Sequence, residues 1–175
     1  MQTVPIVAVT AAYQPAFDPP LAPALVLVVC GKHDRGHLFP KARRQVENLK
    51  APLRKLLGEF DGNSPLVFHD GSPQAEATVA LMGFPYESNQ GERSFFFAPE
   101  RTGPDEWDVN QAYQLIAKTD TERIVFFVVD RKFATKFAQF YQRRLGKPAE
   151  PLRLGEGDAV VFETDGTRHV LSPRD

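Results

Sequence analysis

Four residues with reactive or ligating side chains lie at, or directly after, the ends of apolar runs: Cys30, His69, Asp70 and Asp130. A thiol can act as a nucleophile, and imidazole and carboxylate groups can transfer protons or bind a metal ion. The residue types therefore allow two kinds of hydrolytic chemistry, one through the cysteine and one through a bound metal.

A metal site would use the histidines and aspartates near these ends, and its candidate ligands are His33, His37, His69 and Asp130. The spacing of His33 and His37 would suit two ligands on one face of a helix, but Gly36 between them predicts a loop. A solvated polar rim explains the same side chains without a metal. We expect neither a metal nor a cofactor.

Cys30 and Asp130 also have structural explanations. A cysteine phosphatase needs an arginine and a ring of backbone N–H groups around its thiolate, but the sixth residue after Cys30 is Gly36 rather than arginine. A small core residue at the end of a buried strand explains Cys30 more simply. Asp130 precedes an amphipathic stretch and is predicted to cap a helix there. His69 and Asp70 are compatible with an ordinary turn.

A sheet and the helices between its strands must position these residues. Apolar runs predict strands at 25–30, 66–69 and 124–129. Helical spacing and caps predict helices over 42–57 with a kink or break at Pro52, over 73–82 with Ser72 as cap, from 104–106 onward, and from Asp130 to Gly146. Asp165-Gly166 predicts a two-residue turn between strands 159–164 and 167–171.

This order of elements is typical of an α/β domain with a mostly parallel sheet and an antiparallel edge hairpin. In open sheets of this class, ligands bind beyond the carboxyl ends of the strands. The residues that we expect to line such a pocket are Gly31, Lys32, His33, His37, His69, Asp70 and Arg131.

Four segments, in the right order, resemble the histidine phosphatase superfamily, whose members have the three-layer phosphoglycerate-mutase-like fold. LVLVVCGKHDRGHLFPKARRQ (25–45) resembles the family's first strand and its Arg-His-Gly motif. LVFHDGSPQAEATVALM (66–82) resembles the segment that carries the second arginine, and RIVFFVVDRKFATKFAQFYQRRLG (123–146) the one that carries the second histidine. LRLGEGDAVVFETDG (152–166) resembles the closing strands.

The catalytic positions of that family carry other residues here. The resemblance places the phosphorylated histidine at Cys30, its adjacent arginine at Val29, the second arginine at Gln74 and the second histidine at Asp130. Phosphoryl transfer depends mainly on positioning and on cations that stabilise the phosphate oxygens. The resemblance therefore implies a domain that has lost its catalytic residues and acts as a binding or regulatory module. The alternative is a phosphatase or other hydrolase with rebuilt chemistry, using Cys30 or a metal.

Composition limits the partners and the setting. The 175 residues include 21 Lys and Arg and 22 Asp and Glu, which leaves a net charge of -1 and no overall field for nucleic acid or an anionic membrane. The single cysteine and the lack of a long apolar run suit a cytoplasmic protein. We expect a proline-rich N-terminal extension over 1–23 and one domain over 24–175. The partner is an unknown protein or small molecule.

The segment 83–104 is predicted to be a long loop that is functional, mobile, or contains a short strand. It contains Phe95, Phe96 and Phe97, whose alternate rings would point to opposite sides of an extended segment. The rings either fold into the chain's own core or form a contact surface, so a homo-oligomer is possible.

Overall fold

The computed structural model describes residues 22–58, 65–82, 87–88, 106–148 and 150–172. A six-stranded sheet in the order β5-β4-β6-β1-β7-β8 forms the centre of the molecule. Its strands are β1 (Ala24–Val29), β4 (Leu66–His69), β5 (Glu87–Ser88), β6 (Ile124–Val129), β7 (Ala159–Phe162) and β8 (Arg168–Leu171). The first four are parallel to one another, whereas β7 is antiparallel to both β1 and β8. The predicted mostly parallel sheet with an antiparallel edge hairpin is confirmed.

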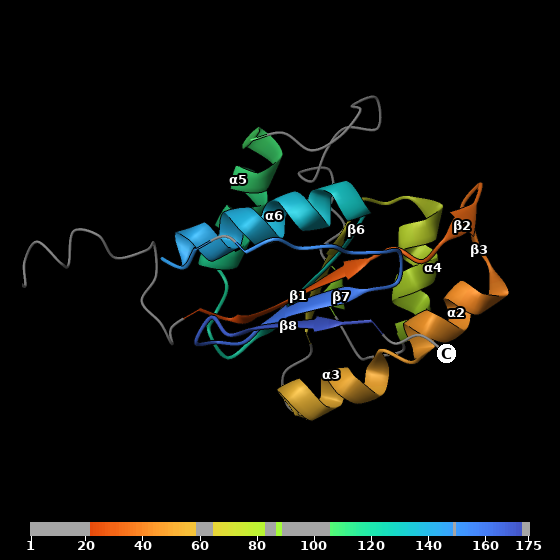
Figure 1. Ribbon diagram of the computed structural model, residues 1–175, viewed down its shortest axis with the longest axis horizontal. Helices are drawn as coiled ribbons and strands as arrows, with labels where there is room; N and C mark the ends of the chain where they lie inside the picture. The colour runs from red at the N-terminus through yellow and green to blue at the C-terminus, as the bar shows by residue number, and fades with distance from the viewer. Residues whose placement is uncertain (1–21, 59–64, 83–86, 89–105, 149, 173–175) are drawn as a thin grey trace, which may run out of the picture.

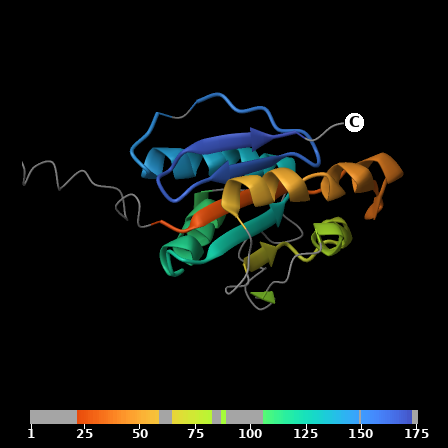
Figure 2. The same cartoon turned by 90° about the horizontal axis from the view of Figure 1, so that it is seen from below.

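Helices cover both faces of the sheet and complete a three-layer α/β architecture (Figures 1 and 2). The helices are α2 (Pro40–Glu47), α3 (Lys50–Leu57), α4 (Pro73–Met82), α5 (Glu106–Ala117) and α6 (Arg131–Arg144). In Figure 1, α5 and α6 lie above the sheet and α3 lies below it. Within the described part of the chain, no helix is both long enough and apolar enough to cross a membrane.

The side chains of the central strands alternate between two hydrophobic clusters, as the pleat of a strand requires. Leu25, Leu27 and Val29 of β1 pack in the cluster with α5 and α6, whereas Val26 and Val28 pack in the cluster with α2, α3 and α4. β1 is buried along its whole length, because it lies between β6 and β7 and has helices on both faces.

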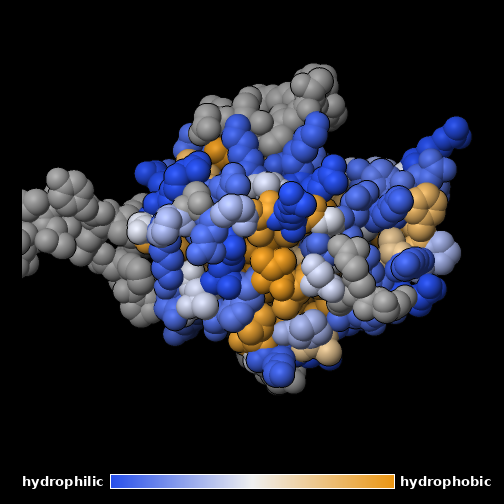
Figure 3. All heavy atoms as spheres, viewed as in Figure 1, coloured by the Kyte–Doolittle hydropathy of each residue, from blue (hydrophilic) through white to orange (hydrophobic). Residues whose placement is uncertain are grey.

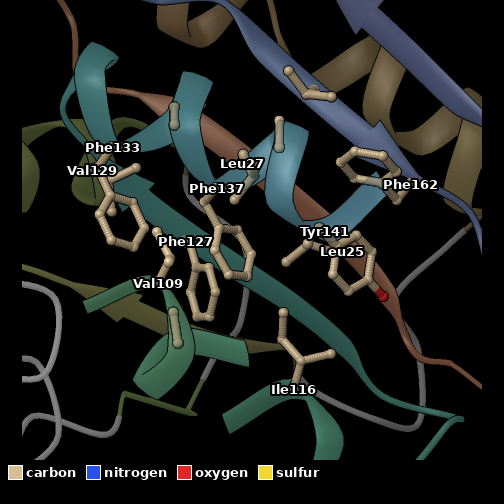
Figure 4. Close-up of a cluster of buried hydrophobic side chains, with 14 of the residues drawn as sticks. Leu25, Leu27, Val109, Ile116, Phe127, Val129, Phe133, Phe137, Tyr141 and Phe162 are labelled. Atoms are coloured by element: carbon tan, nitrogen blue, oxygen red, sulfur yellow. The ribbon is translucent and has the colours of Figure 1, made fainter. Parts of the chain in front are cut away.

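Aromatic rings fill the layer between the sheet and α6 (Figure 4). Phe133, Phe137 and Tyr141 follow one another at a spacing of four residues, which places them on one face of the helix. Their rings are stacked, with centroid distances of 5.7 Å between Phe133 and Phe137 and 5.9 Å between Phe137 and Tyr141. Phe127 of β6 meets Phe137 edge to face at 5.6 Å. This cluster fixes α6, and therefore its first residues, relative to the end of β6.

The helix predicted over 42–57 is in fact two helices, and the break does not lie at Pro52. The chain leaves α2 at Asn48 and enters α3 after Leu49. Pro52 lies in the first turn of α3, where a backbone N–H has no partner within the helix, so its missing donor costs little. The other predicted helices agree with the structure, and α4 covers the predicted residues 73–82.

Two turns also differ from the predictions. The hairpin between β7 and β8 has a three-residue loop, in which Gly166 has a φ of +87° and its N–H donates to the carbonyl of Glu163. A turn followed by a left-handed glycine is the usual form of such loops. The segment around Gly36, predicted to be a loop, is a small hairpin of β2 (His33–Asp34) and β3 (His37–Leu38). Arg35 and Gly36 both have positive φ there, as the two central residues of a type I′ turn require.

Most of the segment 83–104 lies outside the described residues, and so do Phe95, Phe96 and Phe97. Its described part is β5, a short strand that pairs in parallel with β4. A short strand was one of the outcomes predicted for this segment.

Candidate functional site

The carboxyl ends of β4, β6 and β1 lie side by side at one edge of the sheet. Val29 is level with Val129, and His69 is level with Val128. The backbone N–H of Cys30 donates to the carbonyl of Val129 at 2.9 Å. The structure therefore brings together Cys30, Asp70 and Asp130, which follow these three strands, and the resemblance places family histidines at Cys30 and Asp130.

Cys30 is a buried core residue at this edge of the sheet, and its side chain is almost inaccessible to solvent. It is 5% exposed and packs in the cluster that faces α2, α3 and α4. Burial raises the pKa of its thiol well above the ordinary value of 9.0, and the nearby carboxylates of Asp70 and Asp130 raise that pKa further. Since the thiolate is the nucleophilic form of cysteine, these surroundings suppress its reactivity.

The carboxylates of Asp70 and Asp130 are engaged in local structure. Asp70 Oδ1 accepts hydrogen bonds from the backbone N–H and the hydroxyl of Ser72, at 2.9 and 2.7 Å. Asp130 Oδ1 accepts from the backbone N–H of Phe133 at 2.8 Å and caps α6, as predicted. Ser72 in turn caps α4 by accepting from the N–H of Ala75. The turn predicted at His69 and Asp70 is present only in part, because His69 is the last residue of β4 and Asp70 lies in the short connection that leads into α4.

Val29 and Gln74, which stand where the resemblance expects arginines, make structural contacts, and so does the pocket candidate His69. Val29 is 1% exposed and packs toward α5 and α6. His69 is 5% exposed, and its Nδ1 accepts from the backbone N–H of Gly71 at 3.1 Å. Gln74 is half-buried in the first turn of α4, beside the hairpin turn at Gly36.

Gly31 is the residue that allows this close packing. Its backbone N–H donates to Thr78 Oγ1 of α4 at 3.2 Å. A Cβ at this position would lie 3.2 Å from a methyl carbon of Leu38, so the chain passes tightly between β3 and α4. A larger side chain here would have to displace Leu38, so packing alone favours a glycine at this position.

The histidine candidates for a metal site do not assemble with the other ligands. His33 and His37 belong to the β2–β3 hairpin, where they pair with Leu38 and Asp34. His33 Nδ1 accepts from the backbone N–H of Gly36, and His37 is exposed. Among the residues that the structure describes, no three His, Cys, Asp or Glu side chains are placed to hold a metal ion together. Two other residues expected to line the strand-end pocket, Lys32 and Arg131, are exposed.

Asp158 is a buried residue at this edge that sequence reasoning missed. It is 2% exposed, its Oδ2 accepts from the backbone N–H of Gly155 at 2.7 Å, and its carbonyl accepts from the N–H of Val29. Gln45 Nε2 of α2 donates to its Oδ1 at 3.4 Å. The signal in the sequence was an acidic residue in a Gly-rich turn directly before the apolar run 159–162. Asp158 holds the loop before β7 against the end of β1.

The site therefore combines a neutral, buried thiol with carboxylates at the ends of β4 and β6. Both charged groups that shift the pKa of Cys30 are negative. A phosphoryl group carries negative charge on its oxygens and is stabilised by cations and aligned N–H donors. The described contacts of these side chains cap helices and pack the sheet.

Solved structures with this fold come from several organisms. A protein of Nakamurella multipartitia, provisionally named phosphohistidine phosphatase SixA, superposes with a TM-score of 0.54 at 16% identity, over 80% of this chain and 83% of its own. The phosphoglycerate mutase of Thermus thermophilus gives 0.52 at 14% identity, over 87% and 99% of the two chains. A Mycobacterium tuberculosis protein gives 0.55 at 17% identity, over 87% and 98%.

No protein-family model and no curated protein matches the chain in sequence. The structural matches establish the fold, which is the phosphoglycerate-mutase-like fold predicted from the four resembling segments.

Proposed function

We propose that this chain is a histidine-phosphatase-like domain without phosphatase activity, which acts in the cytoplasm as a binding or regulatory module. The observation that carries the proposal is the environment of Cys30, which is buried and neighboured by the carboxylates of Asp70 and Asp130. In the family that the sequence resembles, the equivalent of Cys30 is the histidine that accepts the phosphoryl group. The equivalent of Asp130 is a second histidine that binds the phosphate oxygens.

Electrostatics supports the proposal. An unprotonated carboxylate about 4 Å from a phosphate oxygen costs on the order of 4 kcal/mol at an effective dielectric constant of 20. Each cationic hydrogen-bond donor that is replaced removes about 1.5–3 kcal/mol of binding. Val29 and Gln74 stand where the resemblance expects arginines. Together these changes oppose both phosphate binding and the transfer step.

Local structure gives a second line of support. The two carboxylates serve as helix and turn caps, and Cys30 and Val29 fill opposite clusters of the core. The edge residues are thus explained by folding alone. A domain with this fold whose strand-end site performs no catalysis can still function through a surface that binds a small molecule or a protein.

The proposal is tested by turnover of a chromogenic aryl phosphate, with and without Mg²⁺, Mn²⁺ and Zn²⁺. We expect no release of phenolate above the buffer blank, while an intact histidine phosphatase with the same fold serves as positive control. Turnover that Cys30→Ser abolishes would establish a cysteine enzyme instead. Metal-dependent turnover that His69→Ala abolishes would establish a metal-dependent hydrolase. Either result would overturn the proposal.

A further inference from the structure

A cavity of about 540 Å³ lies between α6 and the segment that leads from α6 back to β7. In Figure 1 this segment runs along α6 before it turns into β7. The residues that line the cavity, here called the α6 groove, are Arg131, Lys132, Thr135, Lys136, Gln139, Leu152, Arg153 and Leu154. It is separate from the core of the strand-end site, because Cys30, Asp70 and Asp130 do not line it.

The α6 groove is lined by four cations, Arg131, Lys132, Lys136 and Arg153, and none of the described residues that line it is acidic. Lys132 and Lys136 are four residues apart and so lie on one face of α6, as do Arg131 and Thr135. Arg153 approaches from the facing segment. In a chain whose net charge is only -1, such a concentration of positive charge is local. It creates a positive potential within a concave surface.

The start of α6 does not itself supply the site, because the side chain of Asp130 already accepts the hydrogen bond of the Phe133 N–H there. The binding groups are side chains from two segments that the fold brings together. The guanidinium groups of Arg131 and Arg153 can each donate two parallel hydrogen bonds to a phosphate group.

The groove is also partly apolar. Leu154 is buried at 7% exposure and Leu152 is half-buried, and both are lining residues. Thr135 and Gln139 add neutral hydrogen-bonding groups. Figure 3 shows an apolar band across the middle of the face drawn there, with hydrophilic side chains on both sides of it. A site with leucines beside cations favours a ligand that has both an apolar body and negative charge over an inorganic ion.

We propose that the α6 groove binds a small organic molecule that carries two or more linked phosphates on an apolar or aromatic body, as a nucleoside diphosphate does. The volume lies within the range of about 300–1,000 Å³ that small-molecule sites occupy. Four cations match a ligand with several negative charges better than a single carboxylate. The groove does not depend on Cys30, so this proposal holds whether or not the strand-end site is active.

Calorimetric titration of the full chain with ADP, pyrophosphate and adenosine tests the proposal. ADP is expected to bind saturably with a 1:1 stoichiometry, pyrophosphate at least several-fold more weakly, and adenosine not measurably. The double variant Lys132→Gln/Arg153→Gln should weaken ADP binding about tenfold or more, the loss expected for one strong ionic hydrogen bond. Both side chains are exposed, so the variant should keep the wild-type melting temperature.

The matched control is Arg143→Gln/Lys147→Gln, which removes two exposed cations at the other end of α6 that do not line the groove. Its affinity for ADP should equal that of the wild type. Equal weakening in both double variants would mean that ADP responds only to net charge and would overturn the proposal. The absence of saturable ADP binding up to about 5 mM would overturn it as well. Binding that Cys30→Ser abolishes and the groove variant leaves intact would place the ligand at the strand ends instead.

Discussion

Replacing Asp130 with alanine should destabilise the fold through the start of α6. The side chain of Asp130 supplies the acceptor for the backbone N–H of Phe133 at 2.8 Å. Without it, that donor has no partner within the helix, since the first N–H groups of a helix have no carbonyl one turn earlier. Phe133 also begins the stack of rings that packs α6 on the sheet, so fraying at this point exposes part of the core.

The magnitude follows from two effects that act in the same direction. Loss of an N-cap acceptor costs about 0.5–2 kcal/mol, and loss of a negative charge at a helix N-terminus costs about a further 0.3–1 kcal/mol. Since Asp130 is half-buried and solvent screens its charge, the effect of the charge lies at the lower end of that range. We therefore expect Asp130→Ala to lower the free energy of unfolding by about 1–2 kcal/mol at pH 7.

The matched control is Asp130→Asn, which keeps an oxygen acceptor at the same place and removes the charge. Its loss should stay below about 0.5 kcal/mol. Urea denaturation of both variants, followed by fluorescence and by circular dichroism, gives the two values with a common slope. Equal losses for alanine and asparagine would refute the capping account, because they would show that the charge and not the acceptor matters. A neutral alanine variant would refute it too.

Cys30 should react slowly with iodoacetamide in the native protein at pH 7–8, because burial and two carboxylates raise the pKa of its thiol; rapid alkylation under those conditions would show an accessible thiolate. The same pKa shift makes the free energy of unfolding depend on pH. Cys30 loses its proton near pH 9.0 in the unfolded chain but only at higher pH in the folded protein. The stability that this thiol contributes is therefore complete below about pH 9 and is lost as the pH rises above it. Relative to Cys30→Ala, the wild type should therefore lose about 1.4 kcal/mol of stability per pH unit above that value in urea titrations, and a constant difference up to pH 10.5 would contradict this reasoning. Gly157→Ala should lower the melting temperature more than Gly146→Ala, although both glycines have positive φ. At Gly157 the new Cβ would lie 2.7 Å from the amide carbon of Gln45, so Gln45 would have to move and lose its hydrogen bond to Asp158, whereas nothing lies within 4 Å at Gly146. Equal shifts would show that backbone strain alone sets the cost.

The sequence predicted the central fold well where periodicity and caps agreed. The apolar run 124–129 and the helix 73–82 appear in the structure with the predicted bounds. Asp130 and Ser72 could be identified as caps because Asp and Ser are good helix N-caps and each precedes an amphipathic or proline-initiated helix. These features depend on residues close together in the chain.

The errors concern places where distant contacts decide the local structure. Asn48 and Leu49 give no strong break signal, but Leu49 and Leu53 are both fully buried, and the chain must change direction between α2 and α3 to pack them. The β2–β3 hairpin packs against α4 so closely that a Cβ on Gly36 would lie 2.7 Å from Pro73, and local sequence cannot reveal this proximity.

For the candidate site, the gathering of the three strand ends could be predicted, but the surroundings of each side chain could not. That Cys30, Asp70 and Asp130 share an edge follows from parallel strands. The buried carboxylate of Asp158 and the α6 groove depend on how the loop before β7 returns along α6, which brings Arg153 to the lysines of that helix. Neither had a pattern in the sequence strong enough to indicate it.

The central claim is that the strand-end site does not hold a phosphoryl group. A crystal structure of the protein grown with phosphate or vanadate would test it most directly, by the density beside Cys30. We expect no anion there, with Asp70 and Asp130 still bonded to the N–H groups of Ser72 and Phe133. A phosphate or vanadate within hydrogen-bonding distance of Cys30, with either carboxylate turned away from its cap, would contradict it.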